Sequence, residues 1–436
     1  MIMSDILNCF PAIKPYEHQT KVLRQVVSAF ASGKKTIVLQ APVGSGKSAI
    51  NFTIAKYYGS GYLSTPQKML VDQMQYDKFF GRQIVALKGR SNYSCLLRYQ
   101  EDNRRPPVGG SSFEEPFHNM SCAGARCQRE KNFNCQFRVI ERQSIKHDSL
   151  LEDPVVYDSQ CYYFDALRNA ITKRLVTTTL AMLLAARRLP TKEVVCVDEG
   201  HNVESWLQKF VSVVVKDLTG EPPKTIEVAL KILDNAYTTA MEQKEILEEE
   251  SGYRALTSEE IQQLEYTQRI VTYGRKVLQD MEHGIRWITY VRMTGNKYSL
   301  EFKPVKVDKY GGLIWSRGKK VIISTATILD WKLYANDVGL TIADIEFIDV
   351  PSVFPPENTQ IVNACVGRMS KEYLEINIPH ALQRLRDILD RESNVRGLIH
   401  AHSYALAKSI KEEIGEPWRS RFIFHDNSDR NNMLKS

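Results

Sequence analysis

Short apolar runs alternate with amphipathic segments along much of the chain. The runs TIVLQ at 36–40, EVVCV at 193–197 and KKVIISTAT at 319–327 have the near-continuous apolar character of strands buried in a parallel sheet. Between such runs, apolar residues recur at helical spacing, as at Val22, Val26 and Phe30 in the segment 11–35. Strands that alternate with helices in this way predict an α/β fold built on a parallel sheet.

Two stretches interrupt this alternation. Residues 96–160 lack long periodic apolar segments and therefore cannot bury much core of their own. From about Lys216 to Ile285 the pattern is helical, and Thr257 and Glu260 have the spacing of a capping box. The acidic run at 242–250 within it is typical of a solvated helix face. Residues 287–307 then alternate as two strands around a Gly-Asn turn.

The last hundred residues return to the first pattern. We expect a helix near Tyr373–Glu392, a strand that runs into a helix at 395–410, and another strand near RFIFHD. This alternation predicts a second parallel-sheet domain. Such a domain normally needs more strand–helix units than the sequence contains, so the second domain is expected to be incomplete.

Length and composition set broad bounds. A chain of 436 residues predicts about two to four compact units, and its 43% hydrophobic and 25% charged residues are typical of a soluble globular protein. No apolar run approaches the ~20 residues of a membrane helix, and the N-terminus has no signal-peptide pattern, so we expect an intracellular protein. The net charge of +7 weakly favours a polyanionic partner.

The sequence APVGSGKS at 41–48 lies between a predicted strand and a predicted helix, which is the context of a phosphate-binding P-loop. Backbone N–H groups of such a loop cradle phosphate oxygens, Lys47 can reach the outer phosphates, and the Ser48 hydroxyl can bind magnesium. Gln19, at the start of the preceding helix, could contact an adenine edge or could equally be a solvated helix residue.

A second motif completes a nucleotide site. Asp198 and Glu199 follow the buried run 193–197 at the carboxyl end of a strand, where a magnesium-binding Asp and a Glu that orients the attacking water belong in a nucleotide hydrolase. Thr325 and Thr327, at the end of the run 319–327, could sense the state of the nucleotide.

Other residues favour a nucleic-acid partner. Thr65 follows a predicted strand and could hold a backbone phosphate. Lys88, Arg90 and Tyr93 combine two cations with an aromatic ring, which suits phosphate contact and base stacking. A solvated loop is the alternative interpretation of these three residues.

Cysteine placement indicates a metal centre. Cys9, Cys196 and Cys365 are isolated, whereas Cys95, Cys122, Cys127, Cys135 and Cys161 fall in one stretch. In a chain without an export signal, such a cluster favours metal binding over disulfides. Bound metal would hold together a segment that buries little core. The spacing is compatible with zinc or with an iron–sulfur cluster.

The ordered motifs APVGSGKS, STPQK, LKGRSNYSC, CYYFDALRNA, VVCVDEGHNVES, VIISTAT, FPPEN and GLIHAHSYALA resemble those of XPD/DinG-type superfamily 2 DNA helicases, which carry an iron–sulfur cluster. The resemblance implies a P-loop RecA-like motor domain interrupted by a cysteine-rich iron–sulfur domain and by a helical arch, followed by the start of a second RecA-like domain. The implied boundaries are 1–90, 166–205 and 291–334 for the first motor domain, 91–165 for the iron–sulfur domain, 206–290 for the arch and 335–436 for the second motor domain.

The resemblance also implies residue roles and cofactors, which are ATP, Mg²⁺ and a [4Fe–4S] cluster. The nucleotide would be bound by Gln19, Gly44, Ser45, Gly46, Lys47 and Ser48. Catalysis would rest on Lys47, Asp198, Glu199 and His201, with Ser48 and Asp198 as magnesium ligands. Cys95 and Cys161 match the first and last cluster ligands, Cys122 and Cys127 are favoured as the middle pair, and Cys135 is the alternative. Gly200 replaces the more usual Ala of the DEAH box.

The implied function is ATP-driven 5′ to 3′ movement along single-stranded or forked DNA by a monomer that does not associate with membranes. The family's last motifs, with the arginine that completes the ATP site, have no match in this sequence. Arginine fingers contribute on the order of 10³ to 10⁵ in rate, so a non-catalytic or partner-dependent nucleic-acid-binding module is an alternative. An RNA helicase is a third, weaker alternative. Because no motif here reads the 2′-hydroxyl, a comparison of stimulation by DNA and by RNA of matched sequence is needed to separate the two.

Overall fold

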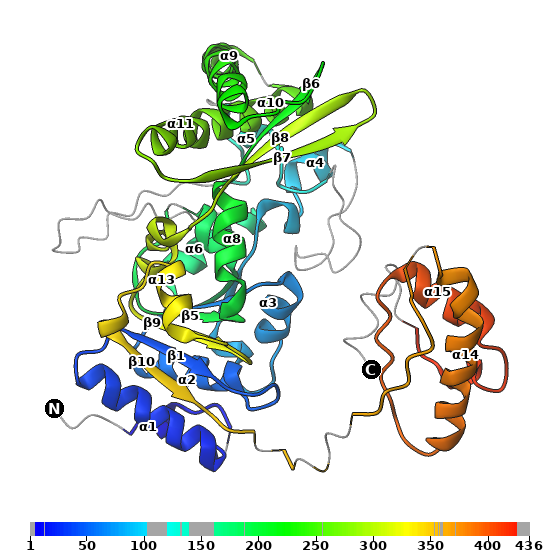
Figure 1. The fold of residues 1–436 in the computed structure, drawn as a ribbon. Helices are drawn as coiled ribbons and strands as arrows, with labels where there is room; N and C mark the ends of the chain where they lie inside the picture. The colour runs from blue at the N-terminus through cyan, green and yellow to red at the C-terminus, as the bar shows by residue number, and fades with distance from the viewer. Residues whose placement is uncertain are drawn as a thin grey trace. The chain divides into compact units, whose positions relative to one another are not determined.

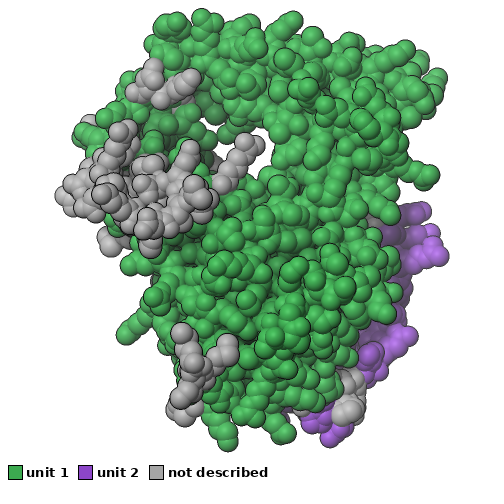
Figure 2. Space-filling view, turned by 90° about the vertical axis from the view of Figure 1, so that its left-hand side faces the viewer, with its two compact units in different colours: residues 1–112, 116–353 green, residues 113–115, 354–436 purple. Residues whose placement is uncertain are grey.

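The computed structural model describes residues 5–12, 14–102, 120–130, 133–138, 161–186, 188–254, 256–352, 354–355, 357, 361–370 and 372–424. The chain divides into two compact units, with described residues up to 352 in unit 1 and from 354 onward in unit 2 (Figures 1 and 2). Each unit is described separately below.

Unit 1 is built on a seven-stranded parallel sheet with the strand order β10-β1-β9-β5-β2-β4-β3, which confirms the predicted α/β fold. In chain order its strands are β1 (Thr36–Gln40), β2 (Gly61–Thr65), β3 (Val85–Leu87), β4 (Leu175–Thr179), β5 (Lys192–Asp198), β9 (Gly318–Thr325) and β10 (Ile345–Asp349).

Alternate residues of each strand point to opposite faces of the sheet. Because the strands are apolar on both faces, helices cover both of them. Ile37 and Leu39 of β1 join the apolar cluster under α1, α2 and α3, whereas Val38 joins the cluster under α6, α7 and α8. The helices of unit 1 in this part of the fold are α1 (Glu17–Ala31), α2 (Lys47–Tyr57), α3 (Lys68–Gln75), α4 (Leu96–Glu101), α5 (Arg126–Arg129), α6 (Tyr162–Thr172), α7 (Leu180–Ala185), α8 (Val203–Val211), α12 (Gly312–Trp315) and α13 (Trp331–Asp337).

A mixed insertion lies between β5 and β9 in the sequence. Its helices are α9 (Ile226–Tyr253), α10 (Ser258–Arg269) and α11 (Arg275–Glu282), with a π-helical turn at Ile270–Gly274. The predicted capping box is confirmed, because Thr257 and Glu260 hydrogen-bond each other's backbone N–H groups.

The same insertion contains a three-stranded antiparallel sheet with the order β6-β8-β7. The predicted hairpin is confirmed as β7 (Trp287–Thr294) and β8 (Lys297–Pro304). Strand β6 (Val213–Leu218) differs from the expected helical start near Lys216. The reason is local packing, because Val213 and Val215 alternate into the core opposite Phe302 and Leu300.

Two further results differ from expectation near the C-terminus. Strand β10 pairs with β1 in the main sheet, so unit 1 extends beyond residue 335, where we expected the second motor domain to begin. In unit 2, α14 (Leu374–Arg391) and α15 (Tyr404–Glu413) form as predicted. The prediction of strands after Val395 and near RFIFHD is wrong for the residues up to 424, because no described residue of unit 2 pairs in a sheet and Leu398 and Ile423 are more than 90% exposed. The last two residues of RFIFHD lie outside the described residues.

Candidate nucleotide and cysteine sites

The predicted P-loop joins the end of β1 to the start of α2. Gly44 and Gly46 have positive φ angles of 82° and 83°, which L-residues rarely adopt. A Cβ on Gly46 would also lie 2.3 Å from the Nε2 atom of Gln19. The loop sequence therefore needs glycine at residue 46 for two independent reasons.

Lys47 is buried against the loop that it follows. Its ammonium donates hydrogen bonds to the carbonyl oxygens of Ala41 at 3.1 Å and Pro42 at 3.3 Å. These carbonyl contacts keep the ammonium inside the loop. The Ser45 hydroxyl is also buried and has no hydrogen-bond partner among the described residues.

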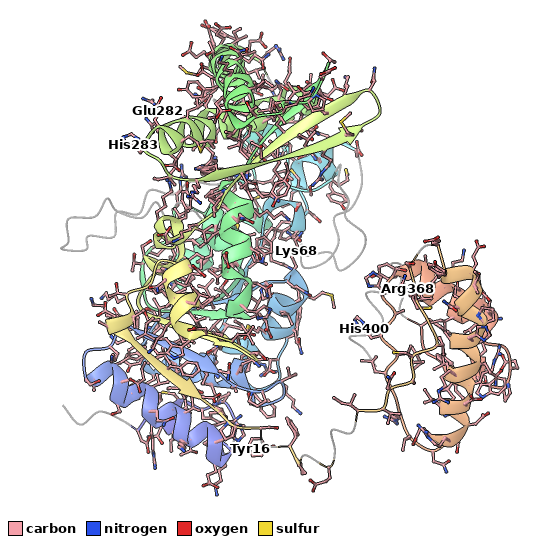
Figure 3. The ribbon with its side chains drawn as sticks, viewed as in Figure 1. Tyr16, Lys68, Glu282, His283, Arg368 and His400 are labelled. Carbon is pink, nitrogen blue, oxygen red and sulfur yellow. The ribbon has the colours of Figure 1, made fainter. Side chains whose placement is uncertain are left out.

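Gln19 braces the P-loop. Its amide nitrogen donates to the Ser45 carbonyl at 3.0 Å, and its amide oxygen accepts from the backbone N–H of Tyr16 at 2.9 Å. Tyr16, labelled in Figure 3, immediately precedes α1. The adenine contact of Gln19 stays a prediction, and the bracing of the loop is a role that the sequence did not indicate.

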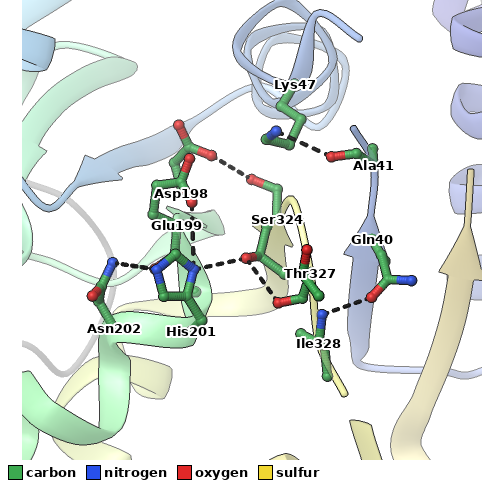
Figure 4. Close-up of polar contacts among 12 residues, drawn as sticks. Gln40, Ala41, Lys47, Asp198, Glu199, His201, Asn202, Ser324, Thr327 and Ile328 are labelled. Carbon is green, nitrogen blue, oxygen red and sulfur yellow. Dashed lines mark hydrogen bonds and ion pairs between the residues drawn. The ribbon is translucent and has the colours of Figure 1, made fainter. Parts of the chain in front are cut away.

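The predicted carboxylates lie on the neighbouring strands. Parallel pairing places Asp198 at the end of β5 beside Ser324 of β9, and Thr325 of β9 beside Gln40 of β1. The ends of β1, β9 and β5 thus bring together the P-loop, the STAT segment (residues 324–327) and the DEGH segment (residues 198–201), as Figure 4 shows.

A hydrogen-bond chain joins these motifs. Asn51 of α2 donates to the Ser324 hydroxyl at 2.8 Å, which donates to the Asp198 carboxylate at 3.1 Å. Burial raises the pKa of Asp198, and the adjacent Glu199 carboxylate raises it further, while the Ser324 hydrogen bond opposes both effects. Asn51 was missed in the sequence, although an amide within the apolar helix segment AINFTIA is a signal of a buried partner.

Glu199 and His201 link the end of β5 to the end of β9. Glu199 has a φ of 51°, in the left-handed region that non-glycine residues rarely occupy. The Nδ1 atom of His201 lies 3.4 Å from the Glu199 carboxylate and 2.9 Å from the Thr325 hydroxyl, and its Nε2 atom lies 3.0 Å from the Asn202 amide. His201 therefore connects the DEGH segment to the STAT segment.

Gly200 has a steric explanation. A Cβ at residue 200 would lie 2.2 Å from the Cγ2 atom of Ile323 on β9. The DEGH segment is held in this position by Tyr334, whose hydroxyl donates to the Gly200 carbonyl at 2.7 Å. An alanine would clash with the core side chain.

The five clustered cysteines line a single cavity, together with Arg90, Arg138 and Phe164. Cys122 is buried, and its thiol interacts with the thiols of both Cys95 and Cys161. Hydrogen bonding to Cys122 lowers the pKa of the Cys95 and Cys161 thiols to about 6. Burial and the two neighbouring thiols raise the pKa of Cys122.

Backbone hydrogen bonds bring these cysteines together from distant segments. Cys122 N–H donates to the Tyr93 carbonyl at 2.7 Å, and Cys161 N–H donates to the Phe137 carbonyl at 3.0 Å. No disulfide joins any of the cysteines. In the described part of the chain, no group of three or more His, Cys, Asp or Glu side chains is arranged so that it could hold a metal ion.

The predicted nucleic-acid residues make internal contacts. Lys88 forms a buried ion pair with Asp72 at 2.6 Å, and the Tyr93 hydroxyl accepts from the Lys88 backbone N–H. The Thr65 hydroxyl donates to the Gln67 carbonyl, and the Arg90 guanidinium lies 4.3 Å from the centre of the Tyr163 ring. Their binding of nucleic acid stays a prediction, and none of the four offers a freely exposed side chain.

None of the helices in the described part of the chain combines the length and apolar character needed to cross a membrane. Residues 12–220 match the family described as type III restriction enzyme, res subunit. No curated protein matches the chain.

Among solved structures, one described as "XPD_Helicase" is 13% identical, with 93% of this chain and 76% of that chain covered and a TM-score of 0.45. "Truncated XPD" is 11% identical, covering 77% and 99% of the two chains at a TM-score of 0.39. "Structure of S. tokodaii Xpd4" is 12% identical, covering 92% and 74% at a TM-score of 0.38. The P-loop and the residues Asp198–His201 both lie within residues 12–220, so this part of the chain is similar to the res-subunit family.

Proposed function

We propose that the chain is an ATP-dependent helicase or translocase that moves along single-stranded DNA in the 5′ to 3′ direction. The observation that carries the proposal is the convergence of Lys47, Thr325 and Asp198 at the ends of β1, β9 and β5. A phosphate-binding loop next to paired carboxylates is the arrangement that NTP hydrolysis requires.

The site residues fit ATP and Mg²⁺ by their chemistry. The Ser48 hydroxyl and the Asp198 carboxylate are oxygen donors of the kind that Mg²⁺ prefers, and the partnerless Ser45 hydroxyl lies within the loop that would hold the phosphates. Bound Mg²⁺ would neutralise phosphate charge. Lys47 would exchange its hydrogen bonds to the Ala41 and Pro42 carbonyls for phosphate oxygens.

Glu199 would orient the attacking water, since it is the second carboxylate beside the half-buried Asp198. His201 touches both Glu199 and Thr325, so a shift of Glu199 on hydrolysis would be transmitted to the STAT segment. Ser324 would hold Asp198 in its ionised form by donating a hydrogen bond to it.

The test is ATP turnover measured with and without single-stranded DNA. We expect DNA to stimulate phosphate release, and we expect Lys47→Ala to abolish turnover while the protein melts at an unchanged temperature. Stimulation by RNA of matched sequence, but not by DNA, would instead favour an RNA helicase. Turnover that persists in Lys47→Ala would contradict the proposal.

We further propose that the cysteine cavity holds a [4Fe–4S] cluster. Five thiols from four separated segments line one cavity, and this donor set fits a thiolate-bound cluster. Cys95, Cys122, Cys161 and either Cys127 or Cys135 would be the ligands. The three hydrogen-bonded thiols would have to separate to receive it. When bound, a cluster would cross-link segments that bury little apolar surface.

Iron and sulfide analysis of anaerobically purified protein tests the cluster. We expect about four iron atoms per chain and their loss in Cys122→Ser. Cys365→Ser is the matched control, because this cysteine is exposed and lies in unit 2. Stoichiometric zinc without iron would contradict the cluster.

A further inference from the structure

The β7–β8 hairpin and the residues that flank it carry an excess of positive charge. Residues 286–306 contain five cations, Arg286, Arg292, Lys297, Lys303 and Lys306, against the single acid Glu301, a difference of +4 within a chain whose total is +7. The two strands run side by side as a long hairpin in the insertion of unit 1 (Figure 1). This local excess of positive charge would attract a polyanion.

One face of the hairpin combines these cations with an exposed aromatic ring. Tyr290 and Arg292 alternate on the same face of β7, with Glu301 and Lys303 on the same face of β8. The Tyr290 ring is 51% exposed, and the Lys303 ammonium lies 4.9 Å from its centre. Arg292 is 79% exposed in its side chain. An exposed ring flanked by cations is the combination that stacks a base and binds its phosphate.

The acid on this face is already neutralised. Glu301 lies 3.7 Å from the Arg292 guanidinium and 3.3 Å from the Lys303 ammonium, so the two cations outweigh it. In addition, β7 is an edge strand, since its only strand partner among the described residues is β8.

We infer that the outer face of the β7–β8 hairpin, formed by Tyr290, Arg292 and Lys303, binds single-stranded nucleic acid, with a base stacked on Tyr290 and a phosphate at Arg292. The inference that the bound nucleic acid is DNA rests on the proposed function. It also accounts for where nucleic acid binds when Thr65, Lys88, Arg90 and Tyr93 are engaged internally. The face is independent of the nucleotide site, because none of its residues belongs to the P-loop, DEGH or STAT segments.

The test is fluorescence anisotropy of a labelled oligothymidylate with the nucleotide-free, full-length chain at several salt concentrations. Tyr290→Ala should weaken binding about 5- to 150-fold, which corresponds to the loss of one stacked base. Arg292→Ala should lower the slope of log affinity against log salt by about 0.7, as expected for one phosphate contact on a single strand. All variants should melt at the temperature of the unaltered protein.

Two matched controls come from the same chain. Tyr253→Ala removes a tyrosine that is 85% exposed beside the acidic run on α9, and Arg24→Ala removes an exposed arginine of α1. Both should bind DNA normally. Unchanged binding in Tyr290→Ala and Arg292→Ala, alongside DNA binding by the unaltered protein, would overturn the inference. Absence of DNA binding by the unaltered protein would overturn the proposed function, and the inference with it.

An acidic protein segment is the competing occupant of a basic edge strand, because such a strand can pair with an extended peptide. Polyglutamate serves as its probe in the same assay. Binding of polyglutamate that is lost in Arg292→Ala, with DNA binding unaffected by Tyr290→Ala, would assign the face to an acidic polypeptide and overturn the inference.

Discussion

Gly200 lies where the DEGH segment presses against strand β9. Its neighbour Ile323 is fully buried and cannot move away, since protein cores are close-packed. We expect Gly200→Ala to lower the free energy of unfolding of unit 1 by about 1–3 kcal/mol through overpacking. Urea unfolding measures this effect.

The matched variant is Gly200→Ala combined with Ile323→Ala, which removes the Cγ2 atom that a residue-200 Cβ would meet. Ile323→Ala alone should cost about 2–5 kcal/mol through its cavity. The double variant should lose less than the sum of the two single losses. Strict additivity would show that the contact is not the reason for glycine at this position.

At the residue scale, the sequence predicted where the motif residues lie in the fold better than it predicted their contacts. Lys47 and Asp198 follow from motif context, because strand, turn and helix fix their positions. The hydrogen bonds from Asn51 to Ser324 and from Gln19 to Ser45 join residues far apart in sequence. The burial of Lys88 was also not predictable, since its partner Asp72 lies on a different element.

At the element scale, two contacts of Glu260 stabilise the first turn of α10: the capping box with Thr257 and an ion pair with Arg254. Hydrogen bonding to the Arg254 guanidinium lowers the pKa of Glu260 from 4.5 to about 2. A carboxyl group whose pKa is lower in the folded protein stabilises the folded form at pH values above its pKa in the unfolded chain. This stabilisation is lost as the pH falls through the pKa of the folded form. The stabilisation is thus full above pH 4.5 and is lost between 4.5 and about 2.

Glu260→Gln keeps a side chain that can cap Thr257 but removes the charge that pairs with Arg254. We expect amides of the first turn of α10 to exchange faster in this variant at neutral pH, and the difference to shrink as the pH falls below 4.5. Intrinsic exchange rates cancel in the comparison. A difference that is constant with pH would indicate that capping geometry, rather than charge, was altered.

Elements were predictable where the periodicity was strong. The helix α1, the central strands and the β7–β8 hairpin follow from their patterns and turn residues. Strand β6 was missed because the run VVVKDL carries polar residues at its end, and its pairing with β8 depends on a segment some 80 residues later. Residues 345–349 were assigned to the following domain, because only the pairing of β10 with β1 reveals their place in the first sheet.

At the scale of the whole molecule, the two units differ in how much apolar surface they bury. Among the described residues from 354 onward, only Leu382 and Ile414 are hydrophobic side chains less than 9% exposed. Full burial of such a side chain contributes about 1.5–3 kcal/mol, and ordering each residue costs about 1–2 kcal/mol of backbone entropy. In unit 1, by contrast, β1, β5 and β9 lie between two large apolar clusters.

We therefore expect unit 2 to open locally without unfolding of unit 1. Hydrogen exchange measured by mass spectrometry should show amides of α14 exchanging about a hundredfold or more faster than amides of β9, because strand amides exchange only through global unfolding. Leu382→Ala should accelerate exchange in α14 and α15 and leave β9 unchanged. Equal protection of α14 and β9, or acceleration of both by Leu382→Ala, would mean that the two units unfold as one cooperative body, and that contacts outside the described cores stabilise unit 2.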